Sequence, residues 1–213
     1  MRNSLPRRTL PALFLATPAL AQRLAPQDVE ASGLLPRLRA GGLVLFFRHA
    51  DTLGEPCDRS YRIGDRAGQR NLSPRGRAQS AAIAARMRAL GIPVALPVLA
   101  GPVYRARDTA ELAFGAANVV VTESLLADDY AGPRLDWVLA EHRRLFAAPV
   151  PAGENRVLVG HRTPAIMVFG DALAGRAFPE GAALVIAPGG TQGSLLGVLE
   201  FAPFPDGGFH GCQ

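Results

Sequence analysis

Four side chains suited to phosphate chemistry lie near apolar runs of the sequence. Arg48 and His49 directly follow the apolar run 43–47, and His161 follows the run 157–159 after a single glycine. Arg105 lies between them, in the segment PVYRARDTA at 102–110. An imidazole can attack phosphorus, and guanidinium groups bind phosphoryl oxygens in pairs without losing their proton. These residue types therefore indicate binding or transfer of a phosphoryl group.

Alternating strand and helix patterns are expected to position these side chains. The continuous apolar run 43–47 is typical of a strand buried on both faces. Further strands are predicted at 96–100, 118–122, 157–159, 182–187 and 194–201, and helices at 27–39, 74–90, 103–114, 133–147 and 163–174. This alternation predicts a three-layer α/β/α sandwich with a mostly parallel central sheet. Ligands of such sheets bind beyond the carboxyl ends of the strands, where Arg48, His49 and His161 are expected to converge.

The first 21 residues have the pattern of a signal peptide. Arg2, Arg7 and Arg8 precede the short apolar run 10–16, and an Ala-Leu-Ala site follows at 19–21. The apolar run is shorter than the ~20 residues of a membrane-spanning helix, although an uncleaved anchor is the alternative. We therefore expect a single mature domain at 22–213, periplasmic or secreted and without stable membrane insertion. Both the general and the twin-arginine export routes stay open.

Composition excludes several classes of protein. Hydrophobic residues make up 48% of the chain, which excludes wholesale disorder. Of the 23 basic residues three lie in the leader, which contains no acid, so 20 basic residues face 18 acidic ones in the remainder. No basic run with interleaved aromatic residues occurs, so a nucleic-acid partner is not expected. The two cysteines, Cys57 and Cys212, are compatible with one disulfide or with two thiols.

Four segments, in order, resemble the histidine phosphatase superfamily, also called the phosphoglycerate mutase-like superfamily. LVLFFRHADT at 43–52 is similar to its Arg-His-Gly signature, with Ala50 in place of glycine. NLSPRGRAQSA at 71–81, PVYRARDTA at 102–110 and VLVGH at 157–161 resemble its next three motifs. The short segment CDRS at 57–60 is also similar to the exported branch that dephosphorylates the heptose of the lipopolysaccharide core. The resemblance implies the phosphoglycerate mutase-like fold and an exported phosphomonoesterase.

The resemblance also implies a role for each matching residue. His49 would be the nucleophile that becomes a phosphohistidine, with its other ring nitrogen held by a backbone carbonyl. Arg48, Arg105 and His161 would bind the phosphoryl oxygens. No cofactor and no metal ion are expected, and the substrate would be a small-molecule or glycolipid phosphate monoester. The two remaining histidines are expected outside the site, His142 in the core and His210 without a role in the tail.

The proton donor is the residue for which the sequence leaves alternatives. LADDYAG at 126–132 resembles the segment that carries an acid in the phosphoglycerate mutase branch, which nominates Asp128, with Asp129 and Glu123 as alternatives. The arginine-bearing loop 53–71 is interpreted as a lid over an anionic substrate or as surface charge. Two other functions stay open: an inactive envelope module that binds phosphorylated ligands, and a phosphoglycerate mutase-type phosphotransferase. A carboxylate near His49 and His161 would distinguish an enzyme from an inactive module.

Overall fold

The computed structural model describes residues 24–53, 57–205 and 210. The predicted signal peptide and Cys212 lie outside the described residues. The strands are β1 (Gln27–Asp28), β2 (Val44–Arg48), β3 (Val94–Ala100), β4 (Val119–Val121), β5 (Asn155–Gly160), β6 (Ala182–Ala187) and β7 (Ser194–Glu200). The α-helices are α1 (Leu35–Ala40), α2 (Pro74–Ala89), α3 (Tyr104–Phe114), α4 (Asp128–Ala131), α5 (Leu135–Ala147) and α6 (Arg162–Phe169). Short 3-10 helices occupy Arg66–Gly68, Ala116–Asn118, Glu123–Leu125, Gly132–Arg134 and Asp171–Leu173.

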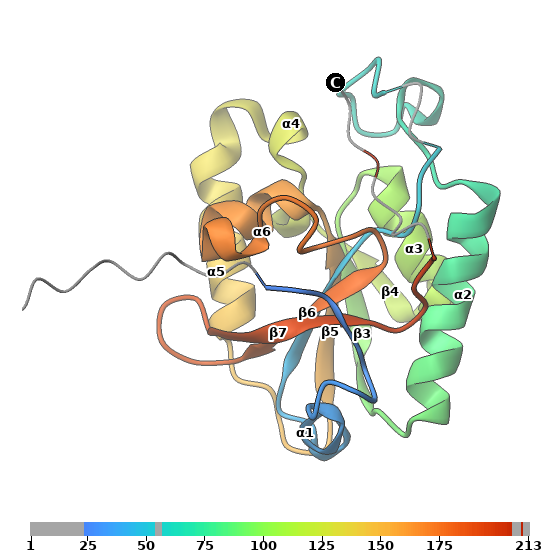
Figure 1. The fold of residues 1–213 in the computed structure, drawn as a ribbon. Coiled ribbons are helices and arrows are strands. Elements are labelled where there is room, and N and C mark those ends of the chain that lie inside the picture. The colour runs from blue at the N-terminus through green and yellow to red at the C-terminus, as the bar shows by residue number, and fades with distance from the viewer. Residues whose placement is uncertain (1–23, 54–56, 206–209, 211–213) are drawn as a thin grey trace, which may run out of the picture.

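The described strands form one sheet in the order β1-β7-β6-β2-β5-β3-β4 (Figure 1). Strand β2 pairs parallel with β5, and β3 pairs parallel with both β5 and β4. Strand β6 is antiparallel to its neighbours β2 and β7, while β1 is parallel to β7. The sheet is therefore mixed but mostly parallel, which confirms the predicted fold class.

Helices cover both faces of this sheet (Figure 1). Along β2, Leu45 and Phe47 pack with Ile83 of α2 in one buried core. Val44 and Phe46, which alternate with them, belong to a second core on the opposite face, together with side chains of α5 and α6. Successive side chains of a strand point to opposite faces, so a strand between two helix layers must be apolar throughout. The uninterrupted run 43–47 follows from this burial.

The amino-terminal part of the domain differs from the prediction. A helix was expected over 27–39, but Gln27–Asp28 is a strand beside β7 and the helix α1 spans only Leu35–Ala40. Gly33 has φ +69°, a left-handed conformation that does not continue a right-handed helix, and Pro36 lies in the first turn of α1, where proline is tolerated. The expected helix 163–174 likewise ends early, at Phe169, because Gly170 has φ +79°.

Helix α2 begins as the sequence predicts. Its N-cap is Ser73, whose Oγ accepts a hydrogen bond from the Gly76 N–H at 2.9 Å, and Pro74 is the first helical residue. The Ser73 N–H donates to the Asp51 carbonyl at 3.0 Å, so the start of α2 lies against the segment that follows β2. Among the described residues, none of the helices is both long enough and apolar enough to cross a membrane.

Candidate active site

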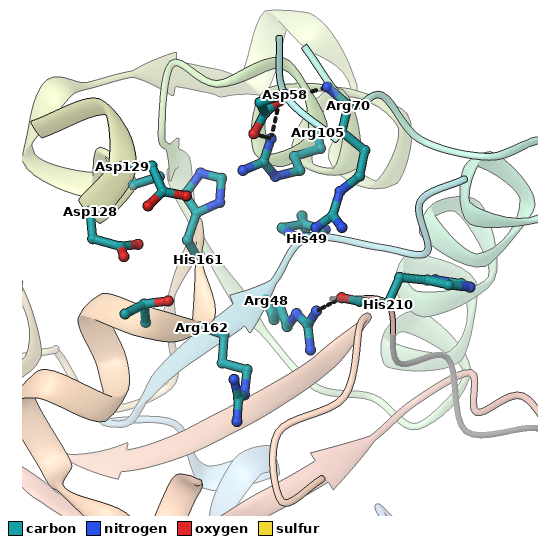
Figure 2. Close-up of a pocket in the computed structure, with 12 residues that line it drawn as sticks. Arg48, His49, Asp58, Arg70, Arg105, Asp128, Asp129, His161, Arg162 and His210 are labelled. Atoms are coloured by element: carbon teal, nitrogen blue, oxygen red, sulfur yellow. Dashed lines mark hydrogen bonds and ion pairs between the residues drawn. The ribbon is translucent and has the colours of Figure 1, made fainter. Parts of the chain in front are cut away.

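A cavity of about 240 Å³ opens at the carboxyl ends of the central strands (Figure 2). The register pairs Arg48 of β2 with Gly160 of β5, and the His49 N–H donates to the Gly160 carbonyl at 3.0 Å. This pairing places His49 and His161 side by side. Strand ends, helix starts, the loop before α2 and the tail all contribute to the lining: Arg48, His49, Asp58, Arg70, Arg105, Ala127, Asp128, Asp129, His161, Arg162, Thr163 and His210.

The His49 ring is held in the tautomer that a nucleophile needs. Its Nδ1 lies 2.9 Å from the Ala50 carbonyl oxygen, which can only accept, so Nδ1 carries the proton and Nε2 keeps its lone pair. Burial lowers the pKa of His49 well below its ordinary value, and the nearby Arg105 and Arg48 lower it further. His49 is therefore neutral at neutral pH, and the expected backbone carbonyl partner is confirmed.

His161 faces the same space as His49. The two ring centroids are 5.5 Å apart, and the His161 side chain is almost completely buried. Its Nε2 has no hydrogen-bond partner among the residues that the structure describes. Burial, followed by the charge of Arg105, lowers the pKa of His161 well below the ordinary value. A buried polar atom without a partner is costly, which indicates that a ligand completes the site.

The two arginines that the sequence singles out are each held by a buried carboxylate. Nη2 of Arg48 donates to Glu180 Oε1 at 3.2 Å, while Nη1 donates to the Phe178 carbonyl at 3.0 Å. Nη1 of Arg105 lies 3.0 and 3.2 Å from the two carboxylate oxygens of Asp58. Both guanidinium groups are thus fixed in place beside the two histidines (Figure 2).

The structure separates the three candidate proton donors. Asp128 and Asp129 begin α4 and line the cavity, whereas Glu123 is exposed and pairs with Arg134 away from it. Burial raises the pKa of Asp128, and the neighbouring charge of Asp129 raises it further. A raised carboxyl pKa favours the protonated form that a general acid requires. Asp128 thus combines the position and the pKa shift expected of the donor.

Several lining residues were missed or misread from the sequence. The structure contradicts the expectation that His210 has no role in the tail: it lines the cavity, and its Nδ1 lies 2.9 Å from Glu180 Oε2. Glu180 itself gives no signal in the sequence, because a single acid in a loop has no periodicity. Asp58 and Arg70 belong to the loop interpreted as a lid or as surface charge, and both line the cavity.

His142 is fully buried against Phe46, which confirms its core position.

A group of potential metal ligands lies beside the cavity. Single ligand atoms of Asp51, Glu180 and His210 all lie within 4.8 Å of one another. The carboxylate of Asp51 already binds Arg75 at 2.8 Å, and that of Glu180 binds Arg48 at 3.2 Å. The charges of the two acids are therefore balanced by two guanidinium groups. The cluster of Asp51, Glu180 and His210 is thus part of a network of ion pairs.

The mixed sheet, its two helix layers and the position of the cavity define an α/β protein of the phosphoglycerate mutase-like fold. Residues 44–133 match the family model of the histidine phosphatase superfamily (branch 1). Together with the ordered motifs, this match supports membership of the histidine phosphatase superfamily, and with it phosphatase activity.

Solved structures share the fold at low sequence identity. The protein histidine phosphatase SixA, solved with tungstate, is 16% identical, with 75% of this chain and 97% of SixA covered and a TM-score of 0.50. A mycobacterial glucosyl-3-phosphoglycerate phosphatase, solved with VO3, is 21% identical, with 73% of this chain and 97% of that chain covered and a TM-score of 0.51. No curated protein matches the chain at a significant level.

Proposed function

We propose that the protein is an exported phosphomonoesterase that hydrolyses a phosphate monoester through a phosphohistidine on His49, without a metal ion. The observation that carries the proposal is the His49 ring, which is buried, neutral and held at Nδ1 by the Ala50 carbonyl, in a cavity that it shares with arginines. A neutral imidazole fixed in this tautomer offers Nε2 to phosphorus.

In the first step Nε2 of His49 forms a bond to phosphorus while the bond from phosphorus to the ester oxygen breaks. Asp128 gives its proton to the departing alkoxide. In the second step a water molecule attacks the phosphohistidine, the ionised Asp128 accepts the proton of that water, and Nε2 leaves as neutral imidazole. Arg48, Arg105 and His161 stabilise the charge that the three equatorial oxygens carry in both transition states.

The position of the acids favours an enzyme over an inactive module that only binds phosphorylated ligands. Asp128 and Asp129 line the same cavity as His49 and His161, and burial raises the pKa of Asp128. In a site that only binds a phosphate anion, the carboxylates of Asp128 and Asp129 would repel the ligand. The same carboxylates are what departure of an alkoxide requires.

The substrate that we propose is a small-molecule or glycolipid phosphate monoester outside the cytoplasm. The predicted signal peptide supports a periplasmic or secreted location, and the similarity of CDRS at 57–60 to the exported branch supports a sugar phosphate. Intact mass of the protein recovered from outside the cytoplasm tests the location. A chain that begins at Gln22 is expected, and a chain that keeps residues 1–21 would contradict cleavage.

Phosphate release tests the reaction. The protein is incubated with p-nitrophenyl phosphate, phosphosugars and lipopolysaccharide fragments, with a chelator present throughout. His49→Ala is expected to lower kcat by about a thousandfold or more while the far-ultraviolet circular dichroism stays unchanged. Quenching with alkaline detergent during turnover should trap phosphate on the wild-type chain alone, and this phosphate should be stable in base and released in acid. Full activity of His49→Ala, or loss of activity with the chelator, would contradict the mechanism.

A further inference from the structure

The carboxylate of Asp58 joins two arginine-bearing segments at the cavity. Its side chain exposes only 7% of its surface. Besides the Nη1 of Arg105, Oδ1 accepts a hydrogen bond from the Arg70 backbone N–H at 2.6 Å (Figure 2). The start of α3 and the loop before α2 are thus tied together by one side chain, and both of these arginines line the cavity.

Asp58 engages Nη1 of the Arg105 guanidinium and makes no hydrogen bond to Nε. Both carboxylate oxygens contact Nη1, and the Nε of Arg105 is buried without a hydrogen-bond partner among the described residues. A tetrahedral oxyanion binds a guanidinium through two parallel N–H groups, and the Nε–Nη2 edge offers such a pair. Asp58 therefore does not occupy the edge that a phosphoryl group would use.

The negative charge of Asp58 also reduces the repulsion between the guanidinium groups of the site. The positive charges of Arg48 and Arg105 both act on His49, and those of Arg162, Arg70 and Arg105 act on Arg48. Guanidinium groups gathered without a counter-charge would move apart or reorient toward water. A buried carboxylate on one of them keeps the cluster together before a substrate arrives.

We propose that Asp58 is a positioning residue for phosphoryl binding, which orients Arg105 through Nη1 and holds the main chain that carries Arg70. The inference rests on the proposed function, because it assigns a partner to the arginines that would bind the phosphoryl group. A displacement of a binding group by about 1 Å costs up to about a hundredfold in rate, so the loss of this orientation has a measurable effect.

Two substitutions separate the hydrogen bonds of Asp58 from its charge. Asp58→Ala removes both, whereas Asp58→Asn keeps an oxygen that can accept from the Arg70 N–H. Asp65→Asn is the matched control in the same loop, because Asp65 accepts from the Gly68 N–H and does not line the cavity. Orthovanadate, a mimic of the phosphoryl group, is the probe.

We expect Asp58→Ala to weaken inhibition by orthovanadate and to raise KM by about tenfold or more, with a smaller decrease in kcat. Asp58→Asn should fall between Asp58→Ala and the wild type, and Asp65→Asn should match the wild type. The thermal midpoint of each variant shows whether a loss reflects unfolding. If Asp58→Ala unfolds at a much lower temperature than the wild type, the test relies on two other measurements. These are the kinetics of Asp58→Asn and the orthovanadate dissociation constant of Asp58→Ala below its thermal midpoint.

Unchanged or tighter orthovanadate inhibition in Asp58→Ala would overturn the inference, since tighter inhibition would mean that the carboxylate competes with the phosphoryl group. Direct calorimetric binding of orthovanadate, measured in parallel, needs no turnover. If the wild type releases no phosphate from any monoester, the proposed function fails. The calorimetric comparison of the same variants still tests whether Asp58 positions an oxyanion site.

Discussion

Arg48 and Glu180 form an ion pair of 3.2 Å whose side chains are 4% and 0% exposed. The same carboxylate accepts from the Thr52 hydroxyl at 3.0 Å and lies 2.9 Å from Nδ1 of His210. One acid in the loop before β6 therefore connects the end of β2 with the tail. The Arg105–Asp58 pair repeats this arrangement on the other side of His49, so each of the two arginines beside the nucleophile has its own buried carboxylate.

The Glu180 pair is expected to matter for stability as well as for activity. Glu180→Ala leaves the buried Arg48 guanidinium without its counter-charge, which typically destabilises a protein by about 3–5 kcal/mol. Urea unfolding measures the change. Glu180→Gln, which keeps an acceptor, should be more stable than Glu180→Ala, with a raised KM.

Glu123→Gln provides the control for this comparison. Glu123 also pairs with an arginine, Arg134, but both side chains are about half exposed, and exposed pairs contribute only about 0–1 kcal/mol. An equal loss of stability in Glu180→Ala and Glu123→Gln would contradict the importance of the buried pair.

Asp128→Asn is expected to lower kcat by an amount that depends on the leaving group of the substrate. Alkyl phosphates need a proton on the departing oxygen, so kcat for them should fall by about a hundredfold or more. p-Nitrophenyl phosphate, whose leaving group is a stable anion, should lose much less. The ratio of kcat values for the two substrates is the measurement, with Asp129→Asn as the neighbouring control. A larger substrate-dependent effect in Asp129→Asn would assign the proton donor to that residue.

The stability of the protein is expected to fall in acid because of the buried His142. Burial lowers the pKa of His142 to about 4 in the folded protein, against about 6.5 in the unfolded chain. Between these values the unfolded chain binds the additional proton. The contribution is therefore fully present above pH 6.5 and is lost as the pH falls toward 4, by roughly 3 kcal/mol in total.

His142→Leu, which cannot titrate, isolates this contribution. Denaturant unfolding between pH 7 and pH 4 should show a smaller loss of stability for the variant than for the wild type. The buried His49 and His161 titrate in both proteins, so the difference between the two curves reports His142 alone. Parallel curves would show that His142 does not contribute to the acid sensitivity.

The two cysteines are expected to form one disulfide. Cys57 is disulfide-bonded in the structure, and Cys212 lies outside the described residues. A bridge between them would close a loop of about 155 residues, for which chain-entropy models give on the order of 4–5 kcal/mol. Intact mass after alkylation, with and without reduction, is the measurement. Two alkylated thiols without reductant would exclude the bridge, with no consequence for the phosphatase mechanism.

The local sequence pattern was sufficient to predict the fold class and the residues at the centre of the site. The apolar runs of β2 and β5 identify strands buried on both faces, and Arg48, His49 and His161 follow from the ends of those strands. The cap at Ser73 is equally local, since Oγ and the Gly76 N–H are three residues apart. Such features depend on neighbours in the chain, so the sequence determines them directly.

The partners of the arginines were decided only by the tertiary structure. Glu180 lies 132 residues from Arg48 and Asp58 lies 47 residues from Arg105, and neither acid belongs to a periodic pattern. The tertiary structure also distinguished between the candidate proton donors. The turn after β4 places Glu123 at the surface, whereas α4 places Asp128 at the cavity. Pairing between distant loops depends on how the strands are arranged in the sheet and on the free energy of burying charge. The spacing of residues along the chain determines neither of these.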